Sequence, residues 1–432
     1  MSDDVSAYPS IGRLTARLAS PVHSPPPAAS VLIVGAGCVG QVLANHLVRS
    51  GASVSFVVRP GSLPGLVEQG FCLRQLDAGS DLEAAGHLTA SLPGADVLDP
   101  GLNVTLFPSV AEALAPMAGD GGDNDGAPAA THYDYVISTL PTDAHRGPDG
   151  QATPFYRGLL EAILPASDTV IVGISAMPEE AALLRTFGFP DDRIIDLGIT
   201  FLAWPAPLPG ERFEGCPPCS QDPEHRTIAY AIAQGLPASS PGGRNERVAA
   251  FAALLSSGGL SCKVVDSACT QLVPGENILG TLLMALELSD WSFEKLMSNA
   301  ELRETTCRAI SERLAIGQQS LADKPGWSSS ASWTFWIGAQ AFRFVLGQRF
   351  LWVVAKFFFS WFTSFDMEAY LRYHFTKVGP QMFMYVKSDL DLAASSNLPT
   401  ENLDLLYNQL KEYKEARGIA TVESRGQGDG QS

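Results

Sequence analysis

Three glycines near the start of the chain have the spacing of a nucleotide-binding loop. Gly35, Gly37 and Gly40 form a G-x-G-x-x-G pattern between an apolar run at residues 31–34 and a helix predicted over residues 41–50. The first glycine permits a tight turn, the second lets the backbone approach a pyrophosphate, and the third lets the helix pack close to the strand. The helix N-terminus and its dipole then favour the phosphates. The pattern predicts a dinucleotide site, with a glycine-rich turn in another kind of α/β protein as the alternative.

The residue at the end of the next strand bears on which nucleotide the loop would hold. Gly51 ends the first helix, residues 53–58 form a second apolar strand, and Arg59 follows it. An acidic residue there would accept hydrogen bonds from the ribose and favour NAD or FAD, whereas a guanidinium suits the 2′-phosphate of NADP(H). The sequence therefore predicts NADP(H). A solvated arginine at a strand end is the alternative, and a flavin is a weaker option because it too would favour an acid.

Length and composition fit a large soluble protein. The 432 residues are 46% hydrophobic, which supports one large or two ordinary domains. A net charge of −17 argues against a nucleic-acid partner. The seven cysteines are odd in number and mostly scattered, so no disulfide framework is predicted, and residues 1–28 lack the apolar core of a secretory signal. We expect a cytoplasmic protein.

Strand and helix candidates alternate through the first part of the chain and give way to helices in the second. Further apolar runs stand at residues 103–107, 133–139, 168–175 and 193–200, and long helical segments follow from about Gly275. We predict an α/β plus all-α protein, in which a Rossmann-type doubly wound sheet precedes a helical domain. The expected divisions are a disordered arm at 1–28, an NADP-binding domain at 29–270, a helical substrate and dimerisation domain at 271–415, and a disordered tail at 416–432.

Four segments together resemble one family of oxidoreductases. They read "VLIVGAGCVGQVLANHLVRSGASVSFVVRPG", "YDYVISTLPT", "VGISAMPEEAALL" and "HFTKVGPQMFMYVKSDLDLAASSNLPTENLDLL". From about residue 30 to 415 the chain is similar to the divergent ketopantoate reductase-like oxidoreductases. The resemblance implies a Rossmann domain and a helical domain, with NADPH and a 2-keto acid in the cleft between them. It implies cofactor contacts at Gly35, Ala36, Gly37, Cys38, Val39, Gly40, Arg59, Thr139, Leu140 and Ser175.

The chain departs from that family at the residues expected to do the chemistry. A lysine follows the fourth strand in authentic ketopantoate reductases, and here Pro141 takes its place. An asparagine expected near the nicotinamide is replaced by Ser175. The lysine that polarises the keto oxygen is absent from "TQLVPGENILGTLLMALEL", where Asn277 is the remaining candidate amide. These departures disfavour ketopantoate itself as the substrate.

The segment "YLRYHFTKVGPQ" offers replacements for the missing lysine. Hydride transfer to a carbonyl develops alkoxide charge, which a positioned cation or donor must stabilise and protonate. On a helix His374 and Lys377 would be neighbours, with Gln381 a turn beyond, unless Gly379 and Pro380 break the helix. We predict Lys377 as the catalytic cation, with His374 as a proton source and Asn277 as an orienting amide. The alternative is a solvated lysine beside a hydrogen-bonded histidine.

The pair of cysteines in "CPPC" is the one candidate metal site that the spacing suggests. Cys216 and Cys219, with His225, provide three potential zinc ligands, but a structural zinc site needs four and no second C-x-x-C exists. The prolines around them are typical of a loop between two strands. We therefore predict no metal, with a zinc or redox pair as the alternative.

Residues 333–365 are very apolar and aromatic. Arg343, Arg349 and Lys356 interrupt the stretch, so it contains no uncharged apolar run long enough for a membrane span. On a helical wheel the three cations fall mostly on one side and leave a wide apolar face. We predict a buried core segment or a homodimer contact, with association at a membrane surface as the alternative.

Two functions follow from these residues. The first is an NADPH-dependent oxidoreductase that reduces the carbonyl group of a small to medium, rather apolar metabolite by hydride transfer. The second is a non-catalytic NADP(H)-binding or sensing protein that has kept the nucleotide site and lost the lysine. Nucleotide titration followed by a turnover screen would separate them.

Overall fold

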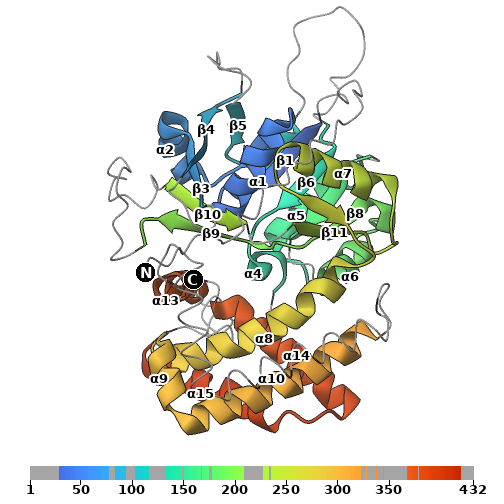
Figure 1. Ribbon diagram of the computed structural model, residues 1–432. Helices are drawn as coiled ribbons and strands as arrows, with labels where there is room; N and C mark the ends of the chain where they lie inside the picture. The colour runs from blue at the N-terminus through green and yellow to red at the C-terminus, as the bar shows by residue number, and fades with distance from the viewer. Residues whose placement is uncertain are drawn as a thin grey trace, which may run out of the picture.

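The protein consists of an α/β part with one wide sheet and a helical part that lies along one side of it (Figure 1). The computed structural model describes residues 29–76, 83–93, 103–115, 132–147, 150–166, 168–174, 178–208, 227–232, 235–322, 367–377 and 379–419, with single positions at 327, 337, 340 and 344. The predicted arm at 1–28 lies outside these residues. The predicted tail at 416–432 overlaps the end of the last helix, which extends to Ala416.

Six parallel strands form the centre of the sheet. Each is a short apolar run whose residues are mostly buried on both faces, as parallel strands covered by helices require. In spatial order they are β5 (Asn103–Phe107), β2 (Ser53–Val57), β1 (Ser30–Val34), β6 (Tyr135–Ser138), β7 (Val170–Gly173) and β8 (Ile194–Leu197). The predicted doubly wound sheet is confirmed. Its chain order reverses between β1 and β6, which is the topological switch point of such a sheet.

Further strands widen the sheet to twelve. They are β4 (Glu83–Ser91), β3 (Phe71–Leu76), β10 (Thr227–Ile232) and β9 (Phe201–Ala206) beyond β5, and β11 (Leu236–Ser239) and β12 (Cys262–Val264) beyond β8. None of these six strands is among the strand candidates of the sequence analysis. Pro205 and Pro237 interrupt two of them, and proline within a strand sequence argues against a central strand but is tolerated near a sheet edge.

Helices of the α/β part connect the strands. The amphipathic α5 is an example: Thr153 caps it by accepting a hydrogen bond from the Tyr156 amide, Pro154 occupies its first turn, and it buries Tyr156, Leu159, Leu160 and Ile163. The helices are α1 (Cys38–Arg49), α2 (Leu63–Gln69), α3 (Val110–Leu114), α4 (Thr142–His145), α5 (Pro154–Ile163), α6 (Pro178–Thr186) and α7 (Glu246–Ser257), with 3-10 turns η1 (Pro60–Ser62) and η3 (Asp191–Arg193).

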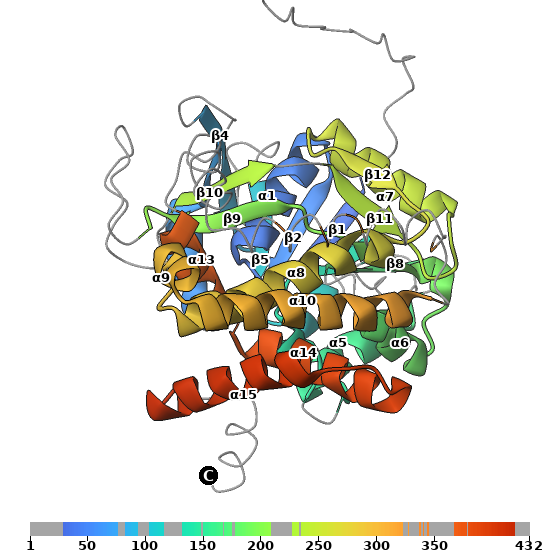
Figure 2. The ribbon, with the colours of Figure 1, turned by 60° about the horizontal axis from the view of Figure 1, so that its bottom comes forward.

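The helical part begins with α8, which runs across the predicted domain division at residue 270. Figure 2 shows α8, α10 and α15 stacked beneath the sheet. The long helix expected from "YLRYHFTKVGPQ" onward is two helices, because α13 ends at Lys377 and α14 starts at Gly379, where Pro380 follows. The helices are α8 (Ala268–Leu288), α9 (Phe293–Ser298), α10 (Ala300–Leu321), α13 (Met367–Lys377), α14 (Gly379–Ser396) and α15 (Glu401–Ala416).

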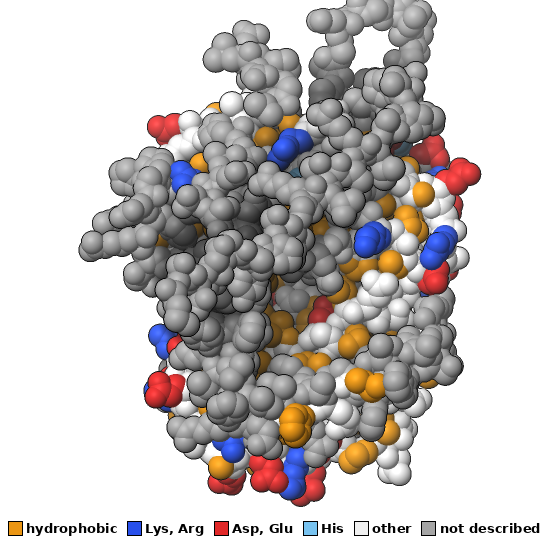
Figure 3. All heavy atoms as spheres, viewed as in Figure 1, with side chains coloured by type: hydrophobic (Ala, Val, Ile, Leu, Met, Phe, Trp, Pro, Cys, Tyr) orange, Lys and Arg blue, Asp and Glu red, His pale blue; other side chains and the backbone are white. Residues whose placement is uncertain are grey.

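Apolar contacts join the two parts. Trp204 of β9 is fully buried and belongs to the same hydrophobic cluster as Leu286 of α8 and Leu314 of α10. Its ring stands at 69° to that of Tyr370 in α13, with centroids 5.4 Å apart. Figure 3 shows further hydrophobic side chains along the described part of this junction.

Two predictions made for other segments fall mostly outside the described residues. The Cys216–Cys219 pair and His225 lie outside them, and the described residues contain no group of three side chains able to hold a metal ion. Of the 333–365 stretch only positions 337, 340 and 344 are described, where Ile337 and Phe344 are 40% and 63% exposed. Among the described helices none is long and apolar enough to cross a membrane.

A buried histidine fixes α1 to the elements behind it. His46 Nδ1 lies 2.8 Å from the carbonyl oxygen of Gly258, and Nε2 lies 3.2 Å from the hydroxyl of Tyr230. Because a carbonyl only accepts, Nδ1 carries a hydrogen, and Nε2 and Gln75 Oε1, each 3.2 Å from the Tyr230 oxygen, share the one hydroxyl hydrogen of Tyr230. Burial lowers the pKa of His46, aided by the charge of Arg49, against the raising effect of the Gly258 hydrogen bond. The native state therefore favours the neutral ring.

We expect this histidine to make stability depend on pH. Since its pKa is lowered on folding, the unfolded chain binds the proton more tightly, and stability is lost as the pH falls from about 6.5 towards the folded value. The loss is about 1.4 kcal/mol for each unit of lowering. Urea unfolding of wild type between pH 5 and 8 should show this slope, His46→Asn should lack it, and His132→Asn, at an exposed site, should keep it. Equal slopes in all three proteins would contradict the assignment.

Candidate functional site

The carboxyl ends of β1 and β6 meet through a single threonine. The Thr139 hydroxyl lies 2.8 Å from the carbonyl oxygen of Gly35 and 3.1 Å from that of Val34, and its amide donates to the same Val34 oxygen at 3.0 Å. These contacts join the two strand ends at the switch point, where ligands of doubly wound sheets bind. Thr139 and Leu140, both predicted from the sequence, therefore adjoin the glycine loop.

Each of the three fingerprint glycines is required, or left open, for a different structural reason. Gly35 has φ +101°, and a Cβ there would lie 3.0 Å from Thr139 and Leu140 side chains. A Cβ on Gly40 would lie 2.4 Å from the Gly35 carbonyl oxygen, so only glycine fits. Gly37 is exposed, and a Cβ there would meet nothing within 4 Å. The structure thus leaves open the one glycine whose backbone a pyrophosphate would approach.

The N-terminus of α1 keeps donors available beside that opening. Gly37 is its N-cap and makes no side-chain cap hydrogen bond, and the first turn of a helix presents backbone amides that have no acceptor within the helix. The side-chain amide of Gln41 (Nε2) donates to the Ala36 carbonyl oxygen at 2.9 Å, which steadies the loop. These residues fit an anionic diphosphate group.

Arg59 stands where the sequence analysis places it, at the end of β2. It is exposed and is the N-cap of the η1 turn. Its guanidinium makes no ion pair or hydrogen bond with any residue in the part of the chain that the structure describes. An unengaged cation at this edge is compatible with a phosphate partner and with a solvated side chain.

Behind the switch point lies a buried polar network that the sequence analysis missed. His145 Nε2 lies 2.6 Å from Ser138 Oγ, its Nδ1 lies 3.3 Å from Glu180 Oε1, and Tyr156 donates to the same oxygen at 2.5 Å. Burial alone would raise the pKa of Glu180, but the hydrogen bond and charge of His145, then Tyr156 and the Arg146 charge, hold it below its usual value.

This network positions α4 rather than attacking a substrate. A serine, a histidine and an acid in that order have the composition of a hydrolase triad. Ser138, His145 and Glu180 are each at most 3% exposed, however, and the ring of Tyr156 is stacked on that of His145 with centroids 4.2 Å apart. The set therefore fixes the short helix that follows Thr139 and Leu140.

A second polar group crosses between the two parts of the molecule. The Tyr385 hydroxyl of α14 lies 2.6 Å from Thr142 Oγ1 at the start of α4, and it accepts a hydrogen bond from Gln381 Nε2 at 2.6 Å. Burial raises the pKa of Tyr385 to about 12, with the Glu276 charge adding to it and the two hydrogen bonds and Arg146 opposing it. Arg146 Nε is itself buried and has no hydrogen-bond partner among the described residues.

Of the three predicted catalytic residues, the side chains of His374 and Asn277 are described. His374 is half-buried, stacked on Tyr370 with ring centroids 5.6 Å apart, and it touches Phe375 edge-on. Asn277 is buried in the contact of α8 with α10, where its amide donates to the Arg313 carbonyl oxygen at 3.1 Å. The side chain of Lys377 and all of Ser175 lie outside the described residues.

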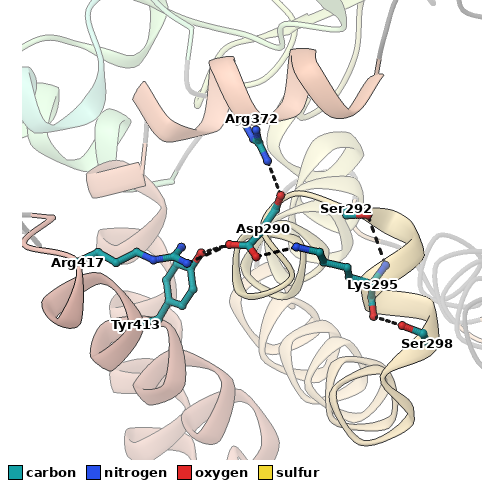
Figure 4. A network of polar contacts seen from close by, with 7 residues as sticks. All are labelled: Asp290, Ser292, Lys295, Ser298, Arg372, Tyr413 and Arg417. Carbon is teal, nitrogen blue, oxygen red and sulfur yellow. Dashed lines mark hydrogen bonds and ion pairs between the residues drawn. The ribbon is translucent and has the colours of Figure 1, made fainter.

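The α13 helix that carries His374 is held by an acidic residue at the end of α8. The Asp290 carboxylate accepts hydrogen bonds from Lys295 Nζ at 2.9 Å, the Tyr413 hydroxyl at 2.9 Å and Arg417 at 3.1 Å (Figure 4). The backbone carbonyl oxygen of Asp290 accepts from Arg372 of α13 at 2.6 Å. The Lys295 hydrogen bond and then that of Arg417 lower the pKa of Asp290. One turn therefore ties α13, α9 and α15 together.

Tyr385, Thr142 and His145 could have been found from two signals. A polar cluster, "TDAH", follows directly on a predicted strand of a doubly wound sheet, which is where functional side chains gather. Gln381 and Tyr385 are four residues apart, so helix geometry alone puts them side by side.

Comparison with known proteins identifies the fold but no close relative. No family model and no curated protein sequence matches the chain. The PanE/ApbA family ketopantoate reductase from Ralstonia eutropha JMP134 is 12% identical with a TM-score of 0.53, covering 90% of this chain and 99% of its own. The 2-dehydropantoate 2-reductase from Methylococcus capsulatus is 14% identical with a TM-score of 0.52, covering 91% and 98%.

A dehydrogenase with bound ligands has the same architecture. D-mandelate dehydrogenase in a ternary structure with NADH and anilino(oxo)acetate is 12% identical with a TM-score of 0.52, covering 90% of this chain and 100% of its own. All three likenesses span both parts of the molecule. The chain therefore has the fold of the ketopantoate reductases, as its resembling segments predict.

Proposed function

We propose that the protein is an NADPH-dependent oxidoreductase that reduces the carbonyl group of a small to medium, rather apolar metabolite. The observation that carries the proposal is the open Gly37 backbone at the β1–β6 switch point, beside the first-turn amides of α1, which have no side-chain cap. Among proteins of this fold, D-mandelate dehydrogenase has been solved with NADH and an oxo acid derivative, and ketopantoate reductases share the architecture.

The cofactor would be held by backbone and by one cation. The amides of Cys38, Val39 and Gly40 suit the pyrophosphate, and Arg59 suits a 2′-phosphate by charge-assisted hydrogen bonds. Thr139 and Leu140 lie beside the glycine loop. In the sequence, Ser175 comes two residues after the end of β7. When bound, NADPH supplies the hydride.

The catalytic assignment rests on the segment at the end of α13. Lys377 is proposed to stabilise the charge that develops on the carbonyl oxygen, with His374 as a neighbouring polar group and Asn277 as an orienting amide. One of the two Asn277 N–H groups donates to the Arg313 carbonyl oxygen, so the second N–H and the amide oxygen remain for that role. A cytoplasmic location and a homodimer through residues 333–365 remain predictions.

A non-catalytic NADP(H)-binding protein is the second candidate. It is favoured by the sequence of α8, the first helix of the helical part, which contains no lysine at all. Such a protein would bind NADPH as the first candidate does but would reduce no carbonyl compound.

Arg59 should decide between the two nicotinamide cofactors. Its pairing with a 2′-phosphate is worth roughly 1.5–3 kcal/mol, so wild type should bind NADPH about one to two decades more tightly than NADH. Arg59→Ala should remove most of that ratio, whereas Arg308→Ala, at an exposed arginine on α10, should leave it intact. Fluorescence titration measures both affinities, and an unchanged ratio in Arg59→Ala would refute the phosphate contact.

The glycine loop offers a test that separates binding from folding. Gly37→Ala should fold normally, since its Cβ meets nothing, yet it should weaken NADPH binding about tenfold or more because the Cβ occupies the pyrophosphate path. Gly158→Ala, which also meets nothing within 4 Å, is the matched control and should change neither property. Gly40→Ala should instead lower the unfolding temperature, since its Cβ would collide with Gly35. Normal NADPH affinity in Gly37→Ala would count against the site.

Lys377 should affect turnover and not cofactor affinity. Removing a donor to a developing oxyanion costs about 10²–10³ in rate, so Lys377→Ala should lose that much kcat while NADPH affinity stays near wild type. Lys387→Ala, ten residues along in α14 and paired with Asp391, is the control. Near-normal kcat in Lys377→Ala would remove this lysine from the mechanism.

A further inference from the structure

The Tyr385 hydroxyl makes a hydrogen bond across the two parts of the molecule and another within its own helix. Its two neighbours come from different elements, Thr142 from the start of α4 and Gln381 from the preceding turn of α14, each at 2.6 Å. α4 and α14 are in contact along this line. The phenol is therefore held at the junction by the α/β part as well as by its own helix.

That junction adjoins the candidate cofactor site. Thr142 stands three residues after Thr139, whose hydroxyl contacts the carbonyl oxygens of Val34 and Gly35. Pro141 is the N-cap of α4, and the buried Ser138–His145 contact holds the other end of this short segment. Thr142 is therefore connected to the glycine loop by a short segment whose two ends are held by hydrogen bonds. The hydroxyl is thus placed by the same backbone that lines the crevice.

The environment keeps a proton on this hydroxyl. Gln381 Nε2 can only donate, so the phenol oxygen accepts from it and its own hydrogen is free to point to Thr142 or to a ligand oxygen. Burial and the Glu276 charge raise the pKa of Tyr385 to about 12. The group is consequently un-ionised throughout the neutral range, which suits a donor to an oxygen that becomes strongly basic as it takes up charge.

We propose that Tyr385 is the proton donor of the reduction, with Thr142 and Gln381 as its positioning residues. The proposal rests on the reductase function proposed above. The carbonyl carbon receives the hydride and forms a new C–H bond, and the π pair of the carbonyl moves to oxygen. The O–H bond of Tyr385 breaks as its proton passes to that oxygen, which yields the alcohol. The phenolate then regains a proton from water, so each turnover consumes one NADPH and one solvent proton.

Other described donors are less suited to this step. His374 is stacked against Tyr370 and Phe375, and Asn277 is directed to α10. The hydroxyl of Ser138 and the ring of His145 are each 2% exposed. A tyrosine as donor also leaves Lys377 the separate task of stabilising charge.

Tyr385→Phe tests the proposal directly. We expect kcat for NADPH-dependent reduction of phenylglyoxylate, 4-methyl-2-oxopentanoate or acetophenone to fall about 10²–10³-fold, within the range of general-acid catalysis. NADPH affinity should be unchanged. Calorimetric binding of phenylglyoxylate to the enzyme with NADP+ should weaken about tenfold for the lost hydrogen bond. The residual rate should rise with buffer acid concentration, since protonation must then come from solution, and a purely structural role would not produce that dependence.

The matched control is Tyr133→Phe, which removes a buried hydroxyl that donates to the Ala113 carbonyl oxygen far from the crevice. It should keep wild-type kcat. If Tyr385→Phe retains near-normal kcat without buffer dependence while wild type reduces a ketone, the role of Tyr385 is overturned and the reductase function stands. If wild type binds NADPH but neither reduces nor binds any of the three compounds, the reductase function and this inference both fail. Should Tyr385→Phe not fold, Thr142→Val decides, because unchanged kcat in it would overturn the proposed positioning.

Discussion

The close approach between the end of β6 and the loop after β1 is the contact on which the rest of the structure depends. Thr139 reaches two backbone oxygens of that loop, and Gly40 passes so near Gly35 that a Cβ would lie 2.4 Å from its carbonyl. Two of the fingerprint glycines therefore satisfy packing inside the protein. Only Gly37 is left to a ligand, which is why the fingerprint constrains the fold more than it constrains the chemistry.

From that contact a chain of polar interactions leads to the helical part. Ser138 ends β6 and contacts His145, the Glu180 carboxylate binds on the far side of the ring, and α4 is thereby held against the sheet. Breaking such a buried set by removing one partner leaves unsatisfied polar atoms in an apolar surrounding, at a cost of roughly 1–3 kcal/mol each. Thr142, at the other end of α4, then meets Tyr385 with little freedom of its own. The position of the Tyr385 hydroxyl is thus fixed partly by the α/β part.

The sequence predicts the parts of this arrangement that depend on local pattern. The central strands and the glycine loop follow from short apolar runs and from Gly35, Gly37 and Gly40, and the helix break follows from Gly379 and Pro380. The edge strand β9 is not predicted because Pro205 within it argues against a strand. It is stabilised by its pairing with β10, which the local sequence does not reveal. The Ser138–Glu180 and Thr142–Tyr385 contacts join residues far apart in the chain, and no spacing rule relates them before the fold is known.

The lysine that the resemblance to ketopantoate reductases leads us to expect in α8 is absent, and the packing of this helix gives a physical reason. This helix lies so close to α10 that a Cβ on Gly317 would stand 2.4 Å from Asn277 Nδ2, and a Cβ on Gly280 would stand 2.4 Å from Arg313 Nη1. Arg313 in turn is buried and paired with Asp389 of α14 at 2.6 Å. A long cation on this face of α8 would have to displace that pair and lose its solvation, which costs several kcal/mol unless a partner is supplied. The α8 face toward α10 is therefore committed to packing, and the proton donor proposed above lies instead on α14, with Thr142 of α4 as its partner.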